Sequence, residues 1–371
     1  MALSRAPALD VASLSNAFDA LGGISGLFHA GDDARRAAGI SAEACNFLAV
    51  SAGNHADAPR RRAADRTWIE NPRHHVLPFT DPRYPPALRE MARSPIVLYV
   101  DGCPSVLSDP QLSIVGSRNP TAAGRDIAFG FAESLAACGL GITSGLAEGI
   151  DSAAHRGALA AQGTTVAVLG SGLDIIYPRI NLALSEQIVV QGALISEFPL
   201  GTPPRRVNFP QRNRIIACLS LGTLVVEAAR RSGSLITARL AGDHNRELFA
   251  VPGSIHNPLS RGCHELIRQG AKLTETSADI LTELNFSAFF AGLRRSAGGL
   301  NPAPGIDAGM DKEHKILLDA LGFDPADLDI LVVRTGFKPE AVSSMMLILE
   351  LEGHVQAAPG GRYSRVVRSR R

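Results

Sequence analysis

The feature that most constrains the fold is an alternation, between about residues 96 and 284, of short apolar runs with segments long enough to form helices. We expect strands at seven of these runs: 113–115, 141–143, 165–169, 193–196, 223–226, 248–251 and 271–273. A helix between consecutive strands implies right-handed crossover connections, and such connections make a parallel sheet. The alternation therefore predicts an α/β fold built on an extended Rossmann-like parallel sheet.

One of the intervening segments shows the helical pattern clearly. In residues 120–138, Ile127, Phe131 and Leu135 recur at four-residue spacing and would share one face of a helix. We expect Asn119 to cap this helix, with Pro120 at its first position. Hydrophobic residues make up 45% of the 371-residue chain, enough for the large core that such a domain needs.

The flanking regions follow different patterns. Residues 1–70 contain short helical segments at 11–21, 32–38 and 42–50, and predict a small helical domain. Prolines between 72 and 86 mark its boundary with the sheet domain, which we place at 71–286. Residues 287–310 are rich in Gly, Ala, Pro and Arg and are typical of a linker. Residues 311–371 predict a winged helix, with three helices at 312–321, 325–334 and 339–351 and a hairpin of strands at 354–357 and 362–366.

Composition limits the classes of function. There are 37 basic and 36 acidic residues, a net charge of only +1, so any affinity for nucleic acid must come from a local cluster of cations. The five cysteines form no C-x-x-C pair and no Cys/His cluster, so no metal site is expected. No apolar leader segment and no apolar run of about 20 residues occur, which predicts a soluble, cytoplasmic protein without membrane contact.

Small polar residues follow the predicted strands, at the edge where open parallel sheets bind their ligands. Backbone N–H groups in such turns, helix N-termini and a forked arginine can together bind phosphate. A glycine in one such turn is weak evidence, because it more often serves backbone conformation. No G-x-G-x-x-G follows the first strand and no Walker sequence occurs, so no nucleotide cofactor is expected. The candidate phosphate-binding residues in these turns are Gly116, Ser117, Arg118, Ser144, Gly145, Gly170, Ser171, Gly172, Ser232, Gly233 and Ser234.

An arginine-rich segment before Cys218 adds a second signal. Residues 203–217 contain four arginines within ten positions, together with Phe209 and Asn213. Arginines at the start of a helix are disfavoured by its dipole unless an anion compensates. A phenylalanine among them offers a face for base stacking, which favours single-stranded over duplex nucleic acid. The candidate DNA-binding arginines of this segment are Arg206, Arg212 and Arg214.

These motifs, taken in order, resemble the DprA/Smf family of DNA-processing proteins of bacterial transformation. The resemblance spans about residues 113–280. Its motifs are G-S-R at 116–118, S-G-L-A-E-G-I-D-S-A-A-H at 144–155, L-G-S-G-L-D-I-I-Y-P at 169–178, S-E-F-P at 196–199, F-P-Q-R-N-R-I-I-A at 209–217, V-E-A at 226–228, S-G-S-L-I-T-A at 232–238 and F-A-V-P-G at 249–253. The flanks also agree with the family, whose members often carry an N-terminal helical SAM-like domain and a C-terminal winged helix.

The resemblance implies a homodimer that binds and protects incoming single-stranded DNA and loads the recombinase RecA, with single-strand-binding protein as a further candidate partner. It implies that Ser117 and Arg118 contact phosphate, and that a basic residue at Arg206 and an aromatic residue at Phe209 contact phosphate and base. At least one of Arg212 and Arg214 would face the strand while Asn213 holds the loop. Ser232, Gly233 and Ser234 would complete the anion site.

Three acidic or basic side chains admit a catalytic interpretation. Asp151 and His155 lie one helical turn apart and could touch, but no nucleophile motif or metal ligand accompanies them, which favours a loop-ordering role. Glu227 follows a strand and could be a general base, or could accept hydrogen bonds that order the edge. Tyr177 could stack on a base or shape a turn with Pro178. We expect no catalytic residue.

The alternative function is that of an enzyme. Related Rossmann-like phosphoribohydrolases carry P-G-G-x-G-T-x-x-E, whereas the comparable stretch here is Ser220-Leu221-Gly222-Thr223 with Glu227 one position too far away. A third interpretation, duplex recognition by the winged helix, is weakened because its expected recognition helix, 339–351, contains glutamates and no arginine. A protein-binding role for this domain is favoured, while the arginines near its hairpin leave DNA contact open.

Overall fold

The computed structural model describes residues 3–52, 58–91, 93–286, 312–322, 326–351, 354–358 and 362–365. The chain forms two compact units, Met1–Pro120 with Ile127–Leu284, and Thr121–Asp126 with Asn285–Arg371. The first unit contains both the helical and the sheet domain predicted from sequence, and the predicted linker at 287–310 lies outside the described residues.

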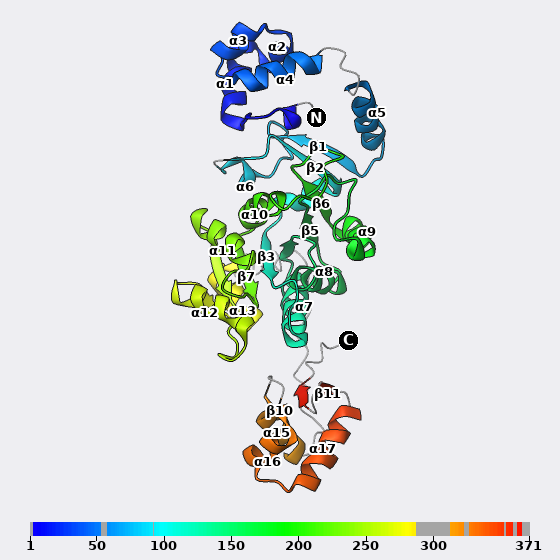
Figure 1. The fold of residues 1–371 in the computed structure, drawn as a ribbon, viewed down its shortest axis with the longest axis vertical. Coiled ribbons are helices and arrows are strands. Elements are labelled where there is room, and N and C mark those ends of the chain that lie inside the picture. Colours follow the sequence, from blue (N-terminus) through cyan, green and yellow to red (C-terminus); the bar gives the residue numbers. More distant parts are fainter. Residues whose placement is uncertain are drawn as a thin grey trace, which may run out of the picture. The chain divides into compact units, whose positions relative to one another are not determined.

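A nine-stranded sheet organises the first unit, in the order β1-β2-β6-β5-β4-β3-β7-β8-β9 (Figure 1). Its seven parallel strands confirm the predicted runs: β3 (Gln111–Gly116), β4 (Gly141–Ser144), β5 (Thr165–Val168), β6 (Ala193–Ser196), β7 (Gly222–Val226), β8 (Glu247–Ala250) and β9 (Lys272–Leu273). The chain runs outward from β3 through β6, then returns to β7 on the other side of β3. The switch point of this doubly wound sheet therefore lies between β3 and β7.

Two further strands, which sequence reasoning missed, extend the sheet beyond β6. Strand β2 (Val97–Gly102) pairs antiparallel with β6, and β1 (His74–Pro78) pairs antiparallel with β2, with Val76 opposite Tyr99. The proline-broken stretch thus holds an edge strand, a position that tolerates proline because one side of its backbone needs no ladder partner.

Helices cover both faces of the sheet, with α10 and α11 on one side and α8 and α9 on the other (Figure 1). Alternation along β5 follows from this layering, because Val166 and Val168 pack with α10 and α11 while Ala167 packs with α9. The helices of this part are α6 (Pro86–Arg89), α7 (Ala122–Ala137), α8 (Ile150–Ala160), α9 (Leu182–Gln191), α10 (Asn208–Leu219), α11 (Ser234–Asp243), α12 (Arg261–Arg268) and α13 (Ser277–Glu283), with 3₁₀ turns η2 (Pro104–Ser108), η3 (Arg179–Asn181) and η4 (Pro258–Ser260).

The helix cap predicted after β3 is shifted along the chain. Helix α7 begins at Ala122, not at Pro120, and the Thr121 hydroxyl accepts a hydrogen bond from the backbone N–H of Gly124 at 3.0 Å. The Asn119 backbone N–H instead donates to the Ser117 hydroxyl at 3.1 Å. Asn119 is therefore part of the loop after β3, and Thr121 takes the capping role.

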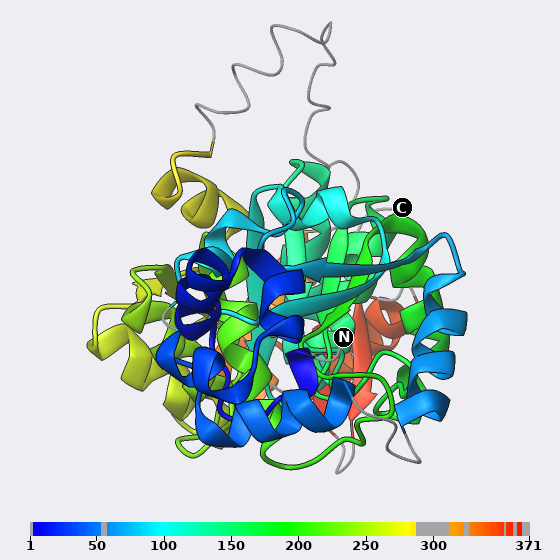
Figure 2. The same ribbon diagram turned by 90° about the horizontal axis from the view of Figure 1, so that it is seen from above.

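The N-terminal helices gather around their own apolar core (dark blue in Figure 2). They are α1 (Val11–Leu21), α2 (Gly23–His29), α3 (Asp32–Ala37) and α4 (Ala42–Ala52), preceded by η1 (Leu3–Arg5) and followed by α5 (Ala58–Ile69). Leu14, Leu27 and Leu48 are fully buried there, and Asp10 caps α1 by accepting from the Ser13 N–H at 2.7 Å. Helix α5 was not among the helical segments expected within residues 1–70, because its sequence is polar and arginine-rich and has no strong apolar period.

The C-terminal unit confirms the predicted winged helix. Its helices are α15 (Lys312–Leu321), α16 (Leu328–Thr335) and α17 (Pro339–Leu351), and its three strands β10 (Ala326–Asp327), β11 (Val355–Ala358) and β12 (Arg362–Arg365) pair in the order β10-β12-β11. Leu317, Leu331, Val342 and Leu349 form its buried core. Strand β10 is an addition to the predicted hairpin.

Candidate nucleic-acid interface

The loops after β3 and β7 are joined at the switch point. The Ser117 backbone N–H donates to the Glu227 carbonyl at 2.8 Å, and the Ser117 carbonyl accepts from the Ile150 N–H at 3.1 Å. A Cβ on Gly116 would lie 1.9 Å from the Val226 carbonyl oxygen, so only glycine permits this approach of the two strands. Gly116 serves backbone packing, and the Ser117 amide is already bonded within the protein.

Two non-glycine residues at strand ends have left-handed backbones. Leu146 after β4 has a φ of 57°, and Glu227 after β7 has a φ of 52°. Such conformations store strain and often accompany functional loops. The Glu227 carboxylate accepts from the Asn257 side-chain amide at 3.3 Å, which ties this strand end to the loop before η4. We keep the loop-ordering role of Glu227 as an interpretation of these contacts.

Arg212 is turned into the protein. Its side chain is 4% exposed, and its guanidinium donates to the Gly145 carbonyl at 2.6 Å, to the Val168 carbonyl and to the Asn213 side-chain oxygen at 3.0 Å. A Cβ on Gly145 would lie 2.2 Å from the guanidinium, so the glycine is required for this contact. Burial lowers the pKa of Arg212 to about 10. Arg212 joins the carboxyl ends of β4 and β5, and no part of this geometry presents it to a bound strand.

Asp151 holds the same loop from the other side. Its carboxylate accepts from the backbone N–H groups of Gly145 at 3.1 Å and Ala147 at 3.3 Å. Burial raises the pKa of Asp151, and the positive charge of Arg212 acts against that rise. The two opposite charges therefore compensate one another beneath the loop after β4.

Arg214 is also engaged in the protein. Its guanidinium donates to the Glu197 carboxylate and to the Arg93 carbonyl, which ties α10 to the loop after β6. Burial raises the pKa of Glu197, with Arg214 opposing. We expected at least one of Arg212 and Arg214 to face a bound strand. In the structure, both side chains form hydrogen bonds within the protein.

The exposed cations lie elsewhere along this edge. Among the described residues, no carboxylate forms an ion pair with Arg118, and the Arg118 guanidinium lies 5.4 Å from the centre of the Phe209 ring. Tyr177, 48% exposed, contacts the same ring at 5.8 Å between centroids with the planes tilted by 44°. Phe209 itself is half-buried. We call Arg118, Tyr177 and Phe209 the aromatic platform. Further exposed arginines include Arg179 near Tyr177, Arg205 and Arg206 before α10, and Arg230 and Arg231 after β7.

The hydroxyls of the predicted turns point largely into the protein. Ser144 donates to the Ile114 carbonyl at 2.6 Å, and Ser171 donates to the Ile175 carbonyl at 2.7 Å. Gly172 packs against the Pro199 carbonyl. Gly170 backs the platform, since a Cβ there would lie 3.0 Å from the Phe209 ring. These turns therefore stabilise the carboxyl edge of the sheet and contribute little to its exposed surface.

The turn before α11 is more open. Ser232 and Ser234 share a hydrogen bond of 2.7 Å between their hydroxyls, and a Cβ on Gly233 would meet nothing within 4 Å. The turn opens a ten-residue helix, whose N-terminal N–H groups favour an anion. This turn directly follows Arg230 and Arg231, which are exposed and precede the predicted anion site at Ser232, Gly233 and Ser234 in the sequence.

His155 does not pair with Asp151, although the two lie one turn apart. Its Nδ1 lies 2.7 Å from the Thr165 hydroxyl, which itself donates to the Ile142 carbonyl at 2.7 Å. The hydroxyl proton is thus committed, so we assign the imidazole proton to Nδ1. Complete burial lowers the pKa of His155 to about 3 and keeps the ring neutral. His155 is a core residue that fixes α8 on β5.

This burial predicts a loss of stability in acid. The pKa of His155 is about 3 when folded and about 6.5 in an unfolded chain, so the unfolded state gains the proton first as pH falls below about 6.5. Between pH 8 and pH 5.5, we expect this residue alone to lower the free energy of unfolding by about 1 kcal/mol. Urea unfolding of wild type and His155→Gln at both pH values measures the difference. Equal pH dependence in the two proteins would contradict the buried neutral imidazole.

No group of three His, Cys, Asp or Glu side chains is placed to bind a metal ion in the described part of the chain. Among the described helices, none combines the length and apolar character of a membrane span.

Comparison with known proteins places this geometry in context. Residues 75–285 match the family model of DNA recombination-mediator protein A, and residues 301–361 match that of the DprA winged helix domain. Protein Smf of Escherichia coli is 43% identical over 301 residues, covering 79% of this chain and 78% of that protein. The DNA processing protein DprA of Streptococcus pneumoniae is 44% identical over 210 residues, 56% of this chain and 73% of that protein.

Solved structures give the same result for the fold. The crystal structure of DprA from Streptococcus pneumoniae matches with a TM-score of 0.61 and 36% identity, covering 68% of this chain and 86% of that one. A structure concerning the single-stranded DNA binding mode of DNA processing protein A from Helicobacter pylori matches with a TM-score of 0.53 and 29% identity, covering 58% of this chain and 96% of that one.

Proposed function

This chain belongs to the DNA recombination-mediator protein A (DprA/Smf) family, and on that premise we propose that it binds single-stranded DNA along the carboxyl edge of its sheet. The relative from Helicobacter pylori is described by its single-stranded DNA binding mode, which supports the proposal. The observation that carries it in this chain is the aromatic platform, where an exposed arginine without an acidic partner among the described residues lies over a half-buried phenylalanine.

The platform suits a single strand for a chemical reason. Single-strand binding combines a cationic track for phosphates with aromatic rings on which unpaired bases stack. Arg118 offers the cation and Phe209 offers the ring, 5.4 Å apart. In a duplex the base faces are covered by their neighbours, so the ring would have nothing to stack on. The preference for single strands follows.

Further exposed arginines lie in chain segments next to the platform residues, and together with Arg118 we call them the cation track. Arg206 precedes it along the chain, and Arg230 and Arg231 follow β7, the strand that neighbours β3 at the switch point. All three are exposed. Concentrating positive charge at one edge reconciles DNA binding with a net charge of only +1. In this proposal Arg212, Asn213 and Arg214 hold the track in place, and do not themselves grip phosphate.

The wider role rests on the family. We propose that the protein protects incoming single strands during transformation and loads RecA on them as a homodimer, with single-strand-binding protein as a further contact. No catalytic step is part of this role. The winged helix contacts protein in this proposal, since the described part of α17 presents no arginine for groove reading.

Arg118→Ala tests the phosphate contact. For single strands the logarithm of the binding constant falls with the logarithm of salt concentration, with a slope of about −0.7 per phosphate neutralised. We expect this variant to make the slope less negative by about 0.7, measured with oligothymidylate by filter binding. Arg268→Ala is the matched control, because Arg268 is exposed in the last turn of α12, the end that leads back to the amino edge of the sheet.

Two outcomes would argue against the proposal. Equal affinity for duplex and single-stranded DNA across salt would remove the basis for stacking. Release of a base or a ribose phosphate from nucleoside monophosphates, abolished by Glu227→Gln, would favour the phosphoribohydrolase alternative instead.

A further inference from the structure

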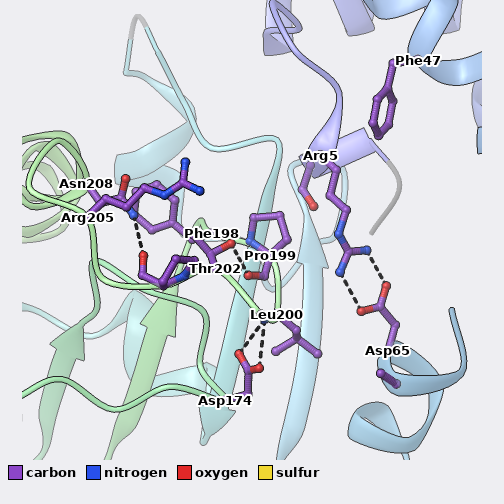
Figure 3. Close-up of a pocket in the computed structure, with 14 residues that line it drawn as sticks. Arg5, Phe47, Asp65, Asp174, Phe198, Pro199, Leu200, Thr202, Arg205 and Asn208 are labelled. Atoms are coloured by element: carbon purple, nitrogen blue, oxygen red, sulfur yellow. Dashed lines mark hydrogen bonds and ion pairs between the residues drawn. The ribbon is translucent and has the colours of Figure 1, made fainter. Parts of the chain in front are cut away.

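A pocket of about 750 Å³ lies between the N-terminal helices and the loop after β6 (Figure 3). Residues of η1, α4 and α5 form one wall, and residues 198–203 with Arg205 and Asn208 form the other. The three residues of the aromatic platform do not line this pocket. Its size is within the range of sites that bind small organic groups.

Contacts within the N-terminal wall, and between the N-terminal helices and the sheet, fix the position of that wall. The Arg5 guanidinium forms a two-pronged ion pair with Asp65, at 2.6 and 2.9 Å, and the Ser4 hydroxyl lies 2.7 Å from the Tyr99 hydroxyl of β2. Phe18 of α1 also stacks on Phe79 after β1, with ring centres 5.9 Å apart. The N-terminal helices are thus anchored to the sheet at more than one point.

The lining combines flat apolar surfaces with a hydrogen-bond acceptor. Phe47 of α4 lines the pocket but does not belong to the buried core of the N-terminal helices. Pro199 and Leu200 line it from the loop after β6. The exposed carboxylate of Asp174 accepts from the Gly201 N–H at 2.9 Å through each oxygen and keeps further acceptor capacity.

The charges select which part of a ligand can enter. Asp65 is neutralised by Arg5, whereas Asp174 would repel a phosphate placed inside the pocket. A neutral heterocycle suits this lining better, with its faces against apolar side chains and its N–H edge toward a carboxylate, as cytosine N4–H donates to Asp or Glu in DNA complexes. Arg205 is exposed, lines the pocket and is available for a phosphate outside it.

Residues of the pocket are also linked to the aromatic platform by short contacts. Asn208 lines the pocket, and its amide donates to the Gly170 carbonyl at 2.9 Å and to the Pro203 carbonyl at 3.3 Å. Gly170 in turn lies against the ring of Phe209. The five residues from Arg205 to Phe209 therefore reach from the pocket to the platform.

From this arrangement we propose that the pocket receives a nucleobase of the bound single strand, near the base that stacks on Phe209. The inference rests on the proposed function, and it makes the N-terminal helices part of the DNA site. The strand passes from the platform along residues 205–209, with its phosphate at Arg205 and its base between Phe47 and the loop after β6.

Photo-crosslinking of the full-length protein tests this directly. An oligothymidylate carrying 4-thiothymidine at several positions would be irradiated with the wild-type protein, and the adducts mapped by mass spectrometry. We expect adducts in the peptide that contains Phe47 and in the peptide that contains Leu200, besides those near Phe209. Adducts near Phe209 alone would overturn the pocket proposal and leave the proposed function intact.

Affinity supplies the second measurement. Because stacking on an aromatic ring is worth about 1–3 kcal/mol per base, Phe47→Ala should weaken binding by roughly 5- to 150-fold without changing the salt slope. Ile24→Ala is the matched control, since Ile24 is a 54% exposed apolar residue of α2 outside the pocket, and it should bind as the wild type does.

The outcomes separate the two proposals. Wild-type affinity in Phe47→Ala together with a flatter slope in Arg118→Ala would refute the pocket and retain the DNA track. Wild-type behaviour in both variants would refute the track as well. If free 4-thiothymidine monophosphate formed an adduct in the Phe47 peptide and the strand formed none there, the ligand would be a free nucleotide, which would overturn the assignment to DNA.

Discussion

Replacing Arg212 with alanine is expected to lower the free energy of unfolding by about 3–5 kcal/mol, the range for removing one member of a buried charge pair. The substitution would leave the Gly145 and Val168 carbonyls without their donor and the buried Asp151 without its compensating charge. Urea unfolding followed by circular dichroism measures the change. The variant should unfold at lower urea concentration, with loss of DNA binding only as a consequence.

A double-mutant cycle makes this result specific. If charge compensation is the cause, Asp151→Asn should cost less in the Arg212→Ala background than in the wild type, because the uncompensated carboxylate has been removed. Arg206→Ala is the control, since Arg206 is exposed and should leave stability unchanged. Wild-type stability with a flatter salt slope in Arg212→Ala would instead make this residue a phosphate ligand.

Phe209→Ala is expected to have a large effect on DNA affinity. Loss of one base–aromatic stack should weaken binding to oligothymidylate by about 1–3 kcal/mol, which corresponds to roughly 5- to 150-fold. The salt slope should stay unchanged, because no phosphate contact is removed. Fluorescence anisotropy at several salt concentrations gives both quantities in one experiment.

Two further variants separate stacking from general apolar contact. Phe209→Tyr keeps the aromatic face and should retain most of the affinity, whereas Phe209→Leu keeps apolar volume and should lose it. Val190→Ala is the matched control, since Val190 is a 78% exposed apolar residue of α9 that belongs neither to the platform nor to the pocket. If the leucine variant bound as tightly as the wild type, the ring would not be a stacking surface.

The sequence contains a signal that distinguishes Arg212 from the exposed arginines of residues 203–217. Asn208, Arg212 and Ile215 follow helical spacing and share the buried face of α10 with Leu219. This period places Arg212 among core positions, a signal that its charge had obscured. Its partners could not be found in the same way, because the Gly145 and Val168 carbonyls lie 67 and 44 residues away along the chain.

The elements that were not predicted from the sequence were missed for a different reason. Strand β1 is five residues long, ends in proline and is stabilised by pairing with β2, so its own sequence hardly distinguishes it from a loop. The pocket beside Phe47 is less visible still, because its walls come from residues near positions 5, 47, 65 and 200. Only the packing of the N-terminal helices on the sheet brings these together.

The amino-acid sequence was sufficient to predict the parallel sheet, the family and the edge of the sheet at which we propose that DNA binds. It could do so because strand–helix alternation fixes the direction of each strand, and parallel strands bring the residues that follow them to one side. The packing of the folded chain sets which side chains at that edge remain exposed. Arg212 and Arg214 satisfy buried carbonyl and carboxylate groups, whereas Arg118 and Arg206 are left exposed to solvent. The physical reason is that a buried polar group must find a partner, and its partners come from distant parts of the chain.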